Sequence, residues 1–222
     1  MPTSTVENYI KQLYLLQQQA PEALVPLGKL AGALGVVPGT VTTMVRTLAD
    51  AGLVQYEPRT GVSLTPAGDK LALHVLRRHR LVELFLVRIL GLDWSEVHEE
   101  AEELEHVISD KVLERIDALL GRPTVDPHGD PIPDAEGQVA QRAMRPLGEC
   151  IAGETIRVER INNQDGQFLR MVTELGLLPG SVHRIARNDR VAGTLAVASE
   201  EGTERVIGTR AAESILVRDA AD

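Results

Sequence analysis

The pattern of apolar and polar positions changes character near residue 147. Before it, apolar residues recur at intervals of three and four, a spacing that predicts amphipathic helices. After it, short segments alternate apolar with polar residues or are rich in β-branched ones, which predicts strands at 155–161, 181–187, 194–199, 204–208 and 214–218. The chain is therefore predicted to be α+β, with a helical N-terminal part and a small β-barrel at its C-terminal end.

The helical part opens with a pattern typical of a winged helix-turn-helix. Helices are predicted at 5–19, 27–36 and 38–52. Thr5 is the expected N-cap of the first, and Pro38 suits the first turn of the third. Residues 53–64 then predict a two-stranded hairpin, the wing, with Arg59 at its tip.

Two longer helices follow, predicted at 66–90 and at 92–121, the second with Ser95 as its N-cap. The next segment is rich in Pro, Gly and Asp and has no sustained period, so it predicts a linker. The expected domains are a winged helix-turn-helix at 1–68, an all-α region at 69–121, a linker at 122–146 and the barrel at 147–222.

The distribution of charge is compatible with a DNA-binding N-terminal unit. The net charge is −9, yet residues 1–82 hold eight Lys or Arg against five Asp or Glu, and residues 83–222 hold fifteen against twenty-seven. Phosphate contacts depend on the local field rather than on the total charge. In the third helix and the wing, the expected DNA-contacting residues are Pro38, Gly39, Thr40, Thr42, Thr43, Arg46 and Arg59.

The alternative for that region is a generic three-helix unit whose threonines are solvated surface. Threonines are weak helix formers, so a run of them on an exposed face favours DNA binding. No segment predicts a membrane helix or a secretory signal, and the single Cys150 excludes a disulfide framework, so we expect a cytoplasmic protein.

The stretch VHEEAEELEHVISD, residues 97–110, carries two histidines and six acids. On a helix, its acids fall into two groups. One group faces solvent: Glu99, Glu100, Glu103 and Asp110. The other lies beside the apolar stripe with the histidines: His98, Glu102, Glu105 and His106. Such side chains are costly to desolvate without compensation, and a divalent cation is one natural compensation.

The preceding helix adds His79 and Glu83, four residues apart on one face, so two metal sites are predicted. The alternative is a salt-bridge network with the arginines of 77–80. An enzyme of the di-metal carboxylate-bundle class is a further alternative, because 103–106 reads Glu-x-x-His; such bundles need a second copy of the motif, which the sequence lacks. These patterns favour a regulator over an enzyme.

The segments RRHRLVELFL, GLDWSEVHEEAEELEHVISD and DPHGDPIP resemble the diphtheria toxin repressor family of metal-dependent transcriptional regulators, which includes MntR-type manganese sensors. The resemblance extends to the C-terminal end, where ELGLLPGS and GTLAV are similar to a FeoA-like SH3-like domain. It implies that residues 69–121 are the dimerisation and metal-binding region of a homodimeric repressor, which binds palindromic operator DNA when loaded with metal. It implies neither an enzyme nor a membrane partner.

Matching by position, the resemblance implies a primary metal site and an ancillary one. The primary ligands would be Asn8, Glu102, Glu105 and His106. The ancillary ligands would be His79, Glu83 and His98, completed from the C-terminal domain by Gln164, Asp165 and Gln167.

The same resemblance bears on which metal is bound. Iron-type members carry Cys where this chain has Glu102, and replacing sulfur by oxygen favours harder ions. The chain departs from the manganese type at Asn8, where that type has Asp, and at Lys11, where short members have an acid. We expect Mn²⁺, two ions per subunit, with Fe²⁺ as the alternative.

Overall fold

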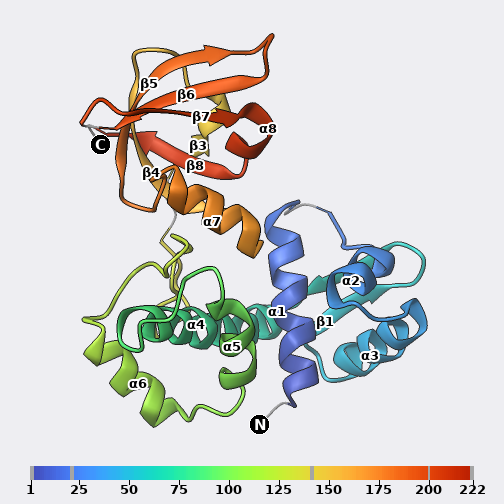
Figure 1. The fold of residues 1–222 in the computed structure, drawn as a ribbon. Coiled ribbons are helices and arrows are strands. Elements are labelled where there is room, and N and C mark those ends of the chain that lie inside the picture. The colour runs from blue at the N-terminus through green and yellow to red at the C-terminus, as the bar shows by residue number, and fades with distance from the viewer. Residues whose placement is uncertain (1–2, 21–22, 141–142, 200, 221–222) are drawn as a thin grey trace. The chain divides into compact units, whose positions relative to one another are not determined.

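The computed structural model describes residues 3–20, 23–140, 143–199 and 201–220 (Figure 1). The chain forms two compact units. The first comprises Met1–His79 with Pro133–Gln138, and the second comprises Arg80–Ile132 with Val139–Asp222. The long helix α4, Pro66–Arg88, runs from the first unit into the second.

The first unit is a winged helix-turn-helix, as predicted. Before α4 it contains α1 (Ser4–Gln18), α2 (Leu27–Leu34), α3 (Pro38–Asp50), β1 (Val54–Glu57) and β2 (Gly61–Leu64). The α2 helix ends at Gly35, whose φ of 65° is the left-handed conformation that glycine adopts without strain. The antiparallel pair β1–β2 forms the wing. The core of the first unit is mainly aliphatic, and its buried residues include Ile10, Leu13, Val41, Val45 and Val62.

The predicted N-cap of the first helix is wrong by two positions. Thr3 has extended backbone, and its side chain accepts a hydrogen bond from the Val6 backbone N–H at 3.4 Å, whereas Thr5 lies inside the first turn of α1. Both residues are threonines followed by the same apolar pattern, so the sequence favoured neither strongly.

The single helix predicted at 92–121 is also wrong. The structure has two helices, α5 (Val97–Leu104) and α6 (Asp110–Leu119). Ser109 is extended, and its hydroxyl accepts a hydrogen bond from the Val112 backbone N–H at 3.4 Å, which makes it the N-cap of α6. Ser95 is not a cap, because its backbone and hydroxyl bond the Asp93 carboxylate instead. Glu105 and His106 therefore lie in a turn after α5.

The C-terminal part of the second unit is one antiparallel sheet of six strands in the order β3-β8-β4-β5-β6-β7. The strands are β3 (Arg145–Pro146), β4 (Thr155–Ile161), β5 (Val182–Asp189), β6 (Thr194–Ser199), β7 (Glu204–Gly208) and β8 (Ile215–Asp219). This arrangement confirms the α+β class. Three short helices were not predicted: η1 (Leu147–Glu149), α7 (Gly166–Glu174) and α8 (Thr209–Ala212).

Much of the segment between α6 and β3 is packed rather than exposed. Asp126, His128 and Ile132 are buried, and Val125 forms an isolated bridge with Pro131. The carboxylate of Asp126 accepts hydrogen bonds from the backbone N–H groups of His128 and Asp130. A segment held by side-chain-to-backbone bonds shows no apolar period, which is why it was predicted to be a linker. Residues 141–142 of that predicted linker lie outside the described residues.

Within the described ranges, no helix combines the length and the apolar character that crossing a membrane requires.

Candidate metal centre and nucleic-acid interface

The first turn of α3 presents the predicted DNA-contacting residues at the surface. Pro38, Gly39, Thr40, Thr43 and Arg46 are exposed, and Thr42 is half-buried. The hydroxyls of Thr42 and Thr43 donate to the carbonyl oxygens of Pro38 and Gly39, at 3.0 and 3.2 Å, which leaves their oxygens free to accept further bonds. A Cβ built on Gly39 would meet nothing within 4 Å, so this end of the helix is unobstructed within its unit.

Arg59 lies at the tip of the wing, as predicted, and is exposed. Its φ of 72° is unusual for a residue other than glycine. A strained arginine at a hairpin tip is consistent with a role for its side chain that a glycine could not fill.

Glu83 is the centre of the donor cluster in the second unit. Its side chain is 1% exposed, and its two carboxylate oxygens face different histidines. Oε1 lies 3.2 Å from Nδ1 of His98, and Oε2 lies 3.7 Å from Nδ1 of His128. His98 also reaches Glu102, with 3.6 Å between Nε2 and Oε1. A buried carboxylate between two imidazoles is suited to hold a divalent cation.

Glu102, Glu105 and His106 follow one another along α5 and the turn after it. Glu105 is fully buried, and its Oε1 lies 3.4 Å from Nε2 of His106, whose side chain is 13% exposed. The Glu102 side chain is 33% exposed. Because α5 ends at Leu104, the buried carboxylate of Glu105 and the nearly buried imidazole of His106 lie in a turn. The more accessible carboxylate of Glu102 lies on the helix just before them.

Three groups of potential ligands have atoms within 4.8 Å of one another among the described residues: His79–Glu83–His98, His79–Glu102–Glu105 and Glu83–Asp126–His128. His79 lies on α4 one turn before Glu83 and is buried. The first group is the set predicted for the ancillary site, and the second contains two residues predicted for the primary site.

The remaining predicted ligands come from other elements. Asn8 lies on α1 in the first unit, where its buried Oδ1 has no hydrogen-bond partner among the described residues. Gln164 donates to Asp130 at 3.0 Å, and Gln167 is exposed. Asp165 is the N-cap of α7, accepting from the backbone N–H groups of Gln167 and Phe168. An unpartnered buried oxygen such as that of Asn8 is the kind of atom a bound cation would satisfy.

Sequence reasoning missed Asp126 and His128, both of which contribute to the third group. Burial, with Asp130 and Glu83 close by, raises the pKa of Asp126 to about 7. Burial alone lowers the pKa of His128, but the carboxylates of Glu83 and Asp126 raise it above its ordinary value overall. The sequence signal that could have found them is the pair of acids on either side of the histidine in DPHGD, residues 126–130. From the sequence, this segment was used only as part of the family resemblance.

The lone thiol lies apart from these donors. Cys150 is buried in the hydrophobic core of the C-terminal sheet, and burial raises its pKa to about 11. The donor atoms gathered in the second unit are therefore oxygen and nitrogen.

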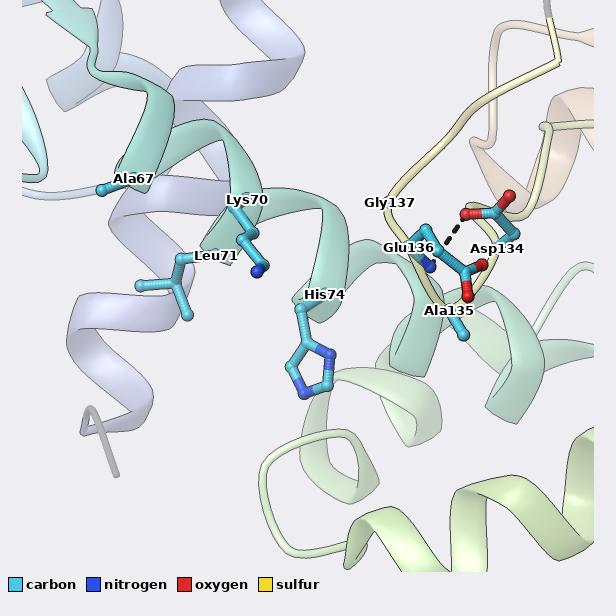
Figure 2. A pocket seen from close by; sticks show the side chains of 8 residues that line it. All are labelled: Ala67, Lys70, Leu71, His74, Asp134, Ala135, Glu136 and Gly137. Atoms are coloured by element: carbon cyan, nitrogen blue, oxygen red, sulfur yellow. Dashed lines mark hydrogen bonds between the residues drawn. The ribbon is translucent and has the colours of Figure 1, made fainter.

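A hollow of about 310 Å³ in the first unit is separate from the predicted ligands. Figure 2 shows Lys70 and His74 of α4 on one side of it, and the loop with Asp134 and Glu136 on the other. The loop is stiffened by Asp134, whose Oδ1 accepts from the Glu136 backbone N–H at 3.0 Å. None of the predicted site residues lines it.

A winged helix-turn-helix followed by helices that gather carboxylates and imidazoles defines a metal-responsive DNA-binding protein. Comparison with known proteins agrees with this class. Residues 1–62 match the family described as iron dependent repressor, N-terminal DNA binding domain, and residues 65–134 match its metal binding and dimerisation domain. Residues 145–219 match the FeoA domain.

Named relatives match over most of their own length. The chain is 34% identical over 188 residues to the diphtheria toxin repressor of Corynebacterium efficiens, covering 80% of each, and 38% identical over 190 residues to the iron-dependent repressor IdeR of Mycobacterium leprae, covering 80% of this chain and 81% of that one. A solved manganese-dependent transcriptional repressor in complex with manganese is 41% identical, with a TM-score of 0.85 over 96% of this chain and 99% of that one.

The chain belongs to the diphtheria toxin repressor family and is a metal-dependent transcriptional repressor with a FeoA domain.

Proposed function

We propose that this repressor responds to Mn²⁺ and, as a homodimer, binds palindromic operators of metal-uptake genes when Mn²⁺ is bound. One observation carries the choice of metal: the clustered donors are carboxylates and imidazoles, and Cys150 is buried in the core of the C-terminal sheet. Oxygen and nitrogen donors without thiolate favour harder divalent ions. The similar structure of a repressor complexed with manganese supports the same choice.

The proposed ligands fall into two sites per subunit. The proposed primary ligands are Asn8, Glu102, Glu105 and His106, and the proposed ancillary ligands are His79, Glu83 and His98. Asp126 and His128 are further candidates for the ancillary site, because they group with Glu83. Gln164, Asp165 and Gln167 are candidates to complete the ancillary site. Asp165 already accepts two backbone N–H groups at Oδ1, so Oδ2 is the atom it would offer to a cation.

Regulation follows from ligands that belong to different units. A cation bound at the primary site would add positive charge beside the carboxylates of Glu102 and Glu105. Asn8 stands on α1, whereas the other primary candidates stand on α5 or in the turn after it, so a cation shared by all four would restrain the DNA-reading unit. A two-fold dimer must place its recognition helices about 34 Å apart, so this ordering sets operator affinity. An approximately 100-fold preference for the ordered state corresponds to about 2.7 kcal/mol.

Exposed apolar side chains in the second unit support a homodimer. Ile89, Leu90, Val107, Val112 and Leu119 are between 48% and 76% exposed, at the end of α4, in the turn after α5 and on α6. Apolar surface on a monomer commonly marks an interface.

The proposed domains are those expected from the sequence: 1–68, 69–121, 122–146 and 147–222. Operator binding requires access to the chromosome, so the proposal places the protein in the cytoplasm.

Fe²⁺ is the second candidate, because the matched families and the mycobacterial relative are named for iron. In the sequence, position 102 argues against it, since a carboxylate stands there instead of the thiolate of iron-type members.

The test uses a duplex that the manganese-loaded protein selects from a random pool. Its binding to stripped protein is then measured by fluorescence anisotropy with Mn²⁺, anaerobic Fe²⁺, Zn²⁺ or no metal. We expect Mn²⁺ to tighten binding about 100-fold. Glu102→Ala and His106→Ala should abolish that gain, and Glu102→Cys should shift activation towards Fe²⁺.

The matched control is Glu103→Ala, because Glu103 is an exposed carboxylate adjacent to Glu102 on α5. It should respond to Mn²⁺ like the unaltered protein. Equal affinity of the stripped and manganese-loaded proteins would refute the proposal.

A further inference from the structure

His128 is held with one particular ring nitrogen facing the candidate metal centre. It is fully buried, and its Nε2 lies 2.9 Å from the backbone carbonyl oxygen of Trp94. A carbonyl oxygen only accepts hydrogen bonds, so Nε2 carries the proton, and in the neutral ring Nδ1 is the nitrogen with a lone pair. Nδ1 lies 3.7 Å from Oε2 of Glu83 and has no hydrogen-bond partner among the described residues.

The backbone on both sides of His128 is fixed. Asp126 accepts from the His128 N–H at 2.8 Å, and the His128 carbonyl accepts from the Ile161 N–H of β4 at 2.8 Å. Gly129 has a φ of 87°, and a Cβ there would lie 1.9 Å from the carbonyl oxygen of Glu159. The loop is thus pressed against the C-terminal sheet, and the position of the imidazole depends on that contact.

Trp94 contacts both His128 and the C-terminal domain. Its ring stacks on the imidazole, with centroids 5.4 Å apart and planes 23° from parallel, in addition to the carbonyl contact. Its indole Nε1–H donates to Oγ1 of Thr173 on α7 at 2.9 Å. It is the one tryptophan of the chain, so its fluorescence reports on this junction alone.

We propose that Trp94 is a positioning residue, which orients His128 with Nδ1 towards Glu83 as a ligand for the cation and ties that orientation to α7 through Thr173. The proposal rests on the proposed function, because it requires a cation beside Glu83. Groups that orient a metal-binding histidine through its other nitrogen typically contribute 10- to 100-fold to metal affinity.

The experiment measures Mn²⁺ affinity of the full chain from the electron paramagnetic resonance signal of free Mn²⁺, with folding checked by circular dichroism. His128→Phe should weaken one of the bound ions. Trp94→Ala removes the stacked ring and the bond to Thr173 but keeps the backbone carbonyl, so it should weaken the same ion by a smaller factor, several-fold. Trp94→Phe, which keeps a stacking ring, should recover part of the loss. Thr173→Val should weaken that ion several-fold. In unaltered protein, Mn²⁺ should change the emission of Trp94, and in His128→Phe it should not.

A double substitution separates positioning from general packing. If Trp94 acts through His128, adding Trp94→Ala to His128→Phe should weaken Mn²⁺ binding no further. Phe168→Leu is the matched control, because Phe168 packs on the same hydrophobic cluster as Trp94, and it should leave Mn²⁺ affinity unchanged.

Two outcomes would overturn the inference while the proposed function stands: Trp94→Ala has the same effect with and without His128, or His128→Phe leaves the affinity of every bound Mn²⁺ unchanged. Failure of the unaltered protein to bind Mn²⁺ would instead remove the proposed function, and the inference with it.

Discussion

The carboxylate of Glu83 meets the imidazole of His98 with 3.2 Å between Oε1 and Nδ1. The contact joins the last third of α4 to the first turn of α5. The Glu83 side chain is 1% exposed and that of His98 is 49% exposed, so one partner is buried and the other reaches solvent. A buried carboxylate needs a positive partner, and the exposed imidazole gives an ion a route to it.

Removing His98 should therefore empty one of the two proposed sites. We expect His98→Ala to reduce the manganese content of the purified protein from two ions per subunit to one, measured by atomic absorption after equilibrium dialysis. Glu99→Ala alters the next residue, which is exposed, and should keep both ions. Two ions retained in His98→Ala would show that His98 is not a ligand.

Arg46 should contribute a phosphate contact. It is exposed on α3, so Arg46→Ala should weaken binding to all duplexes by a similar factor. The slope of log affinity against log salt concentration should become shallower by about 1. Arg88→Ala removes an exposed arginine at the far end of α4 and should change neither quantity. An unchanged salt slope in Arg46→Ala would place Arg46 outside the DNA interface.

Leu119 should lie in the dimer interface. It is 62% exposed at the end of α6, and a charge there would be buried without a partner if α6 meets a second copy. We expect Leu119→Asp to sediment as a monomer where the unaltered protein sediments as a dimer. Val191→Asp, at a fully exposed position between β5 and β6, should remain dimeric. A dimeric Leu119→Asp would move the interface elsewhere.

Cys150 should be chemically inert in the folded protein. Burial raises its pKa from the usual 9.0 to about 11, so at pH 8 the reactive thiolate is about 100-fold scarcer than for an ordinary cysteine. Ellman's reagent should label it slowly at pH 8 and faster as pH rises towards 11. In denaturant it should react at once. Rapid labelling of the native protein at pH 8 would contradict the buried position.

Much of the fold could be predicted because most of its helices and strands are long enough to show a clear apolar period in the sequence. Strands β4, β6 and β7 match their predicted limits, and α3 begins at Pro38 as expected. The errors arise where one local hydrogen bond decides the structure. The Ser109 hydroxyl starts a new helix inside an unbroken apolar pattern, and periodicity does not register such a cap.

The candidate site was predictable only in part, for a related reason. Four of the candidate ligands lie on or beside helices, so their spacing in the sequence predicts that they share a face: Glu83, His98, Glu102 and Glu105. Asp126 and His128 lie in a loop that approaches Glu83 through tertiary packing, and no spacing in the sequence encodes that approach. Asp165 was predicted only as a candidate ligand. Its role as the N-cap of α7 could not be predicted, because that helix was not predicted.

The burial of the lone thiol, away from ligands made of oxygen and nitrogen, has a consequence for stress. Peroxide inactivates many regulators by oxidising a thiolate that binds their metal. Here no sulfur is present among the proposed ligands, so oxidation of a thiolate is not a route by which peroxide would release the ion. Under the proposed function, operator binding by the repressor would therefore survive treatment that oxidises exposed thiols.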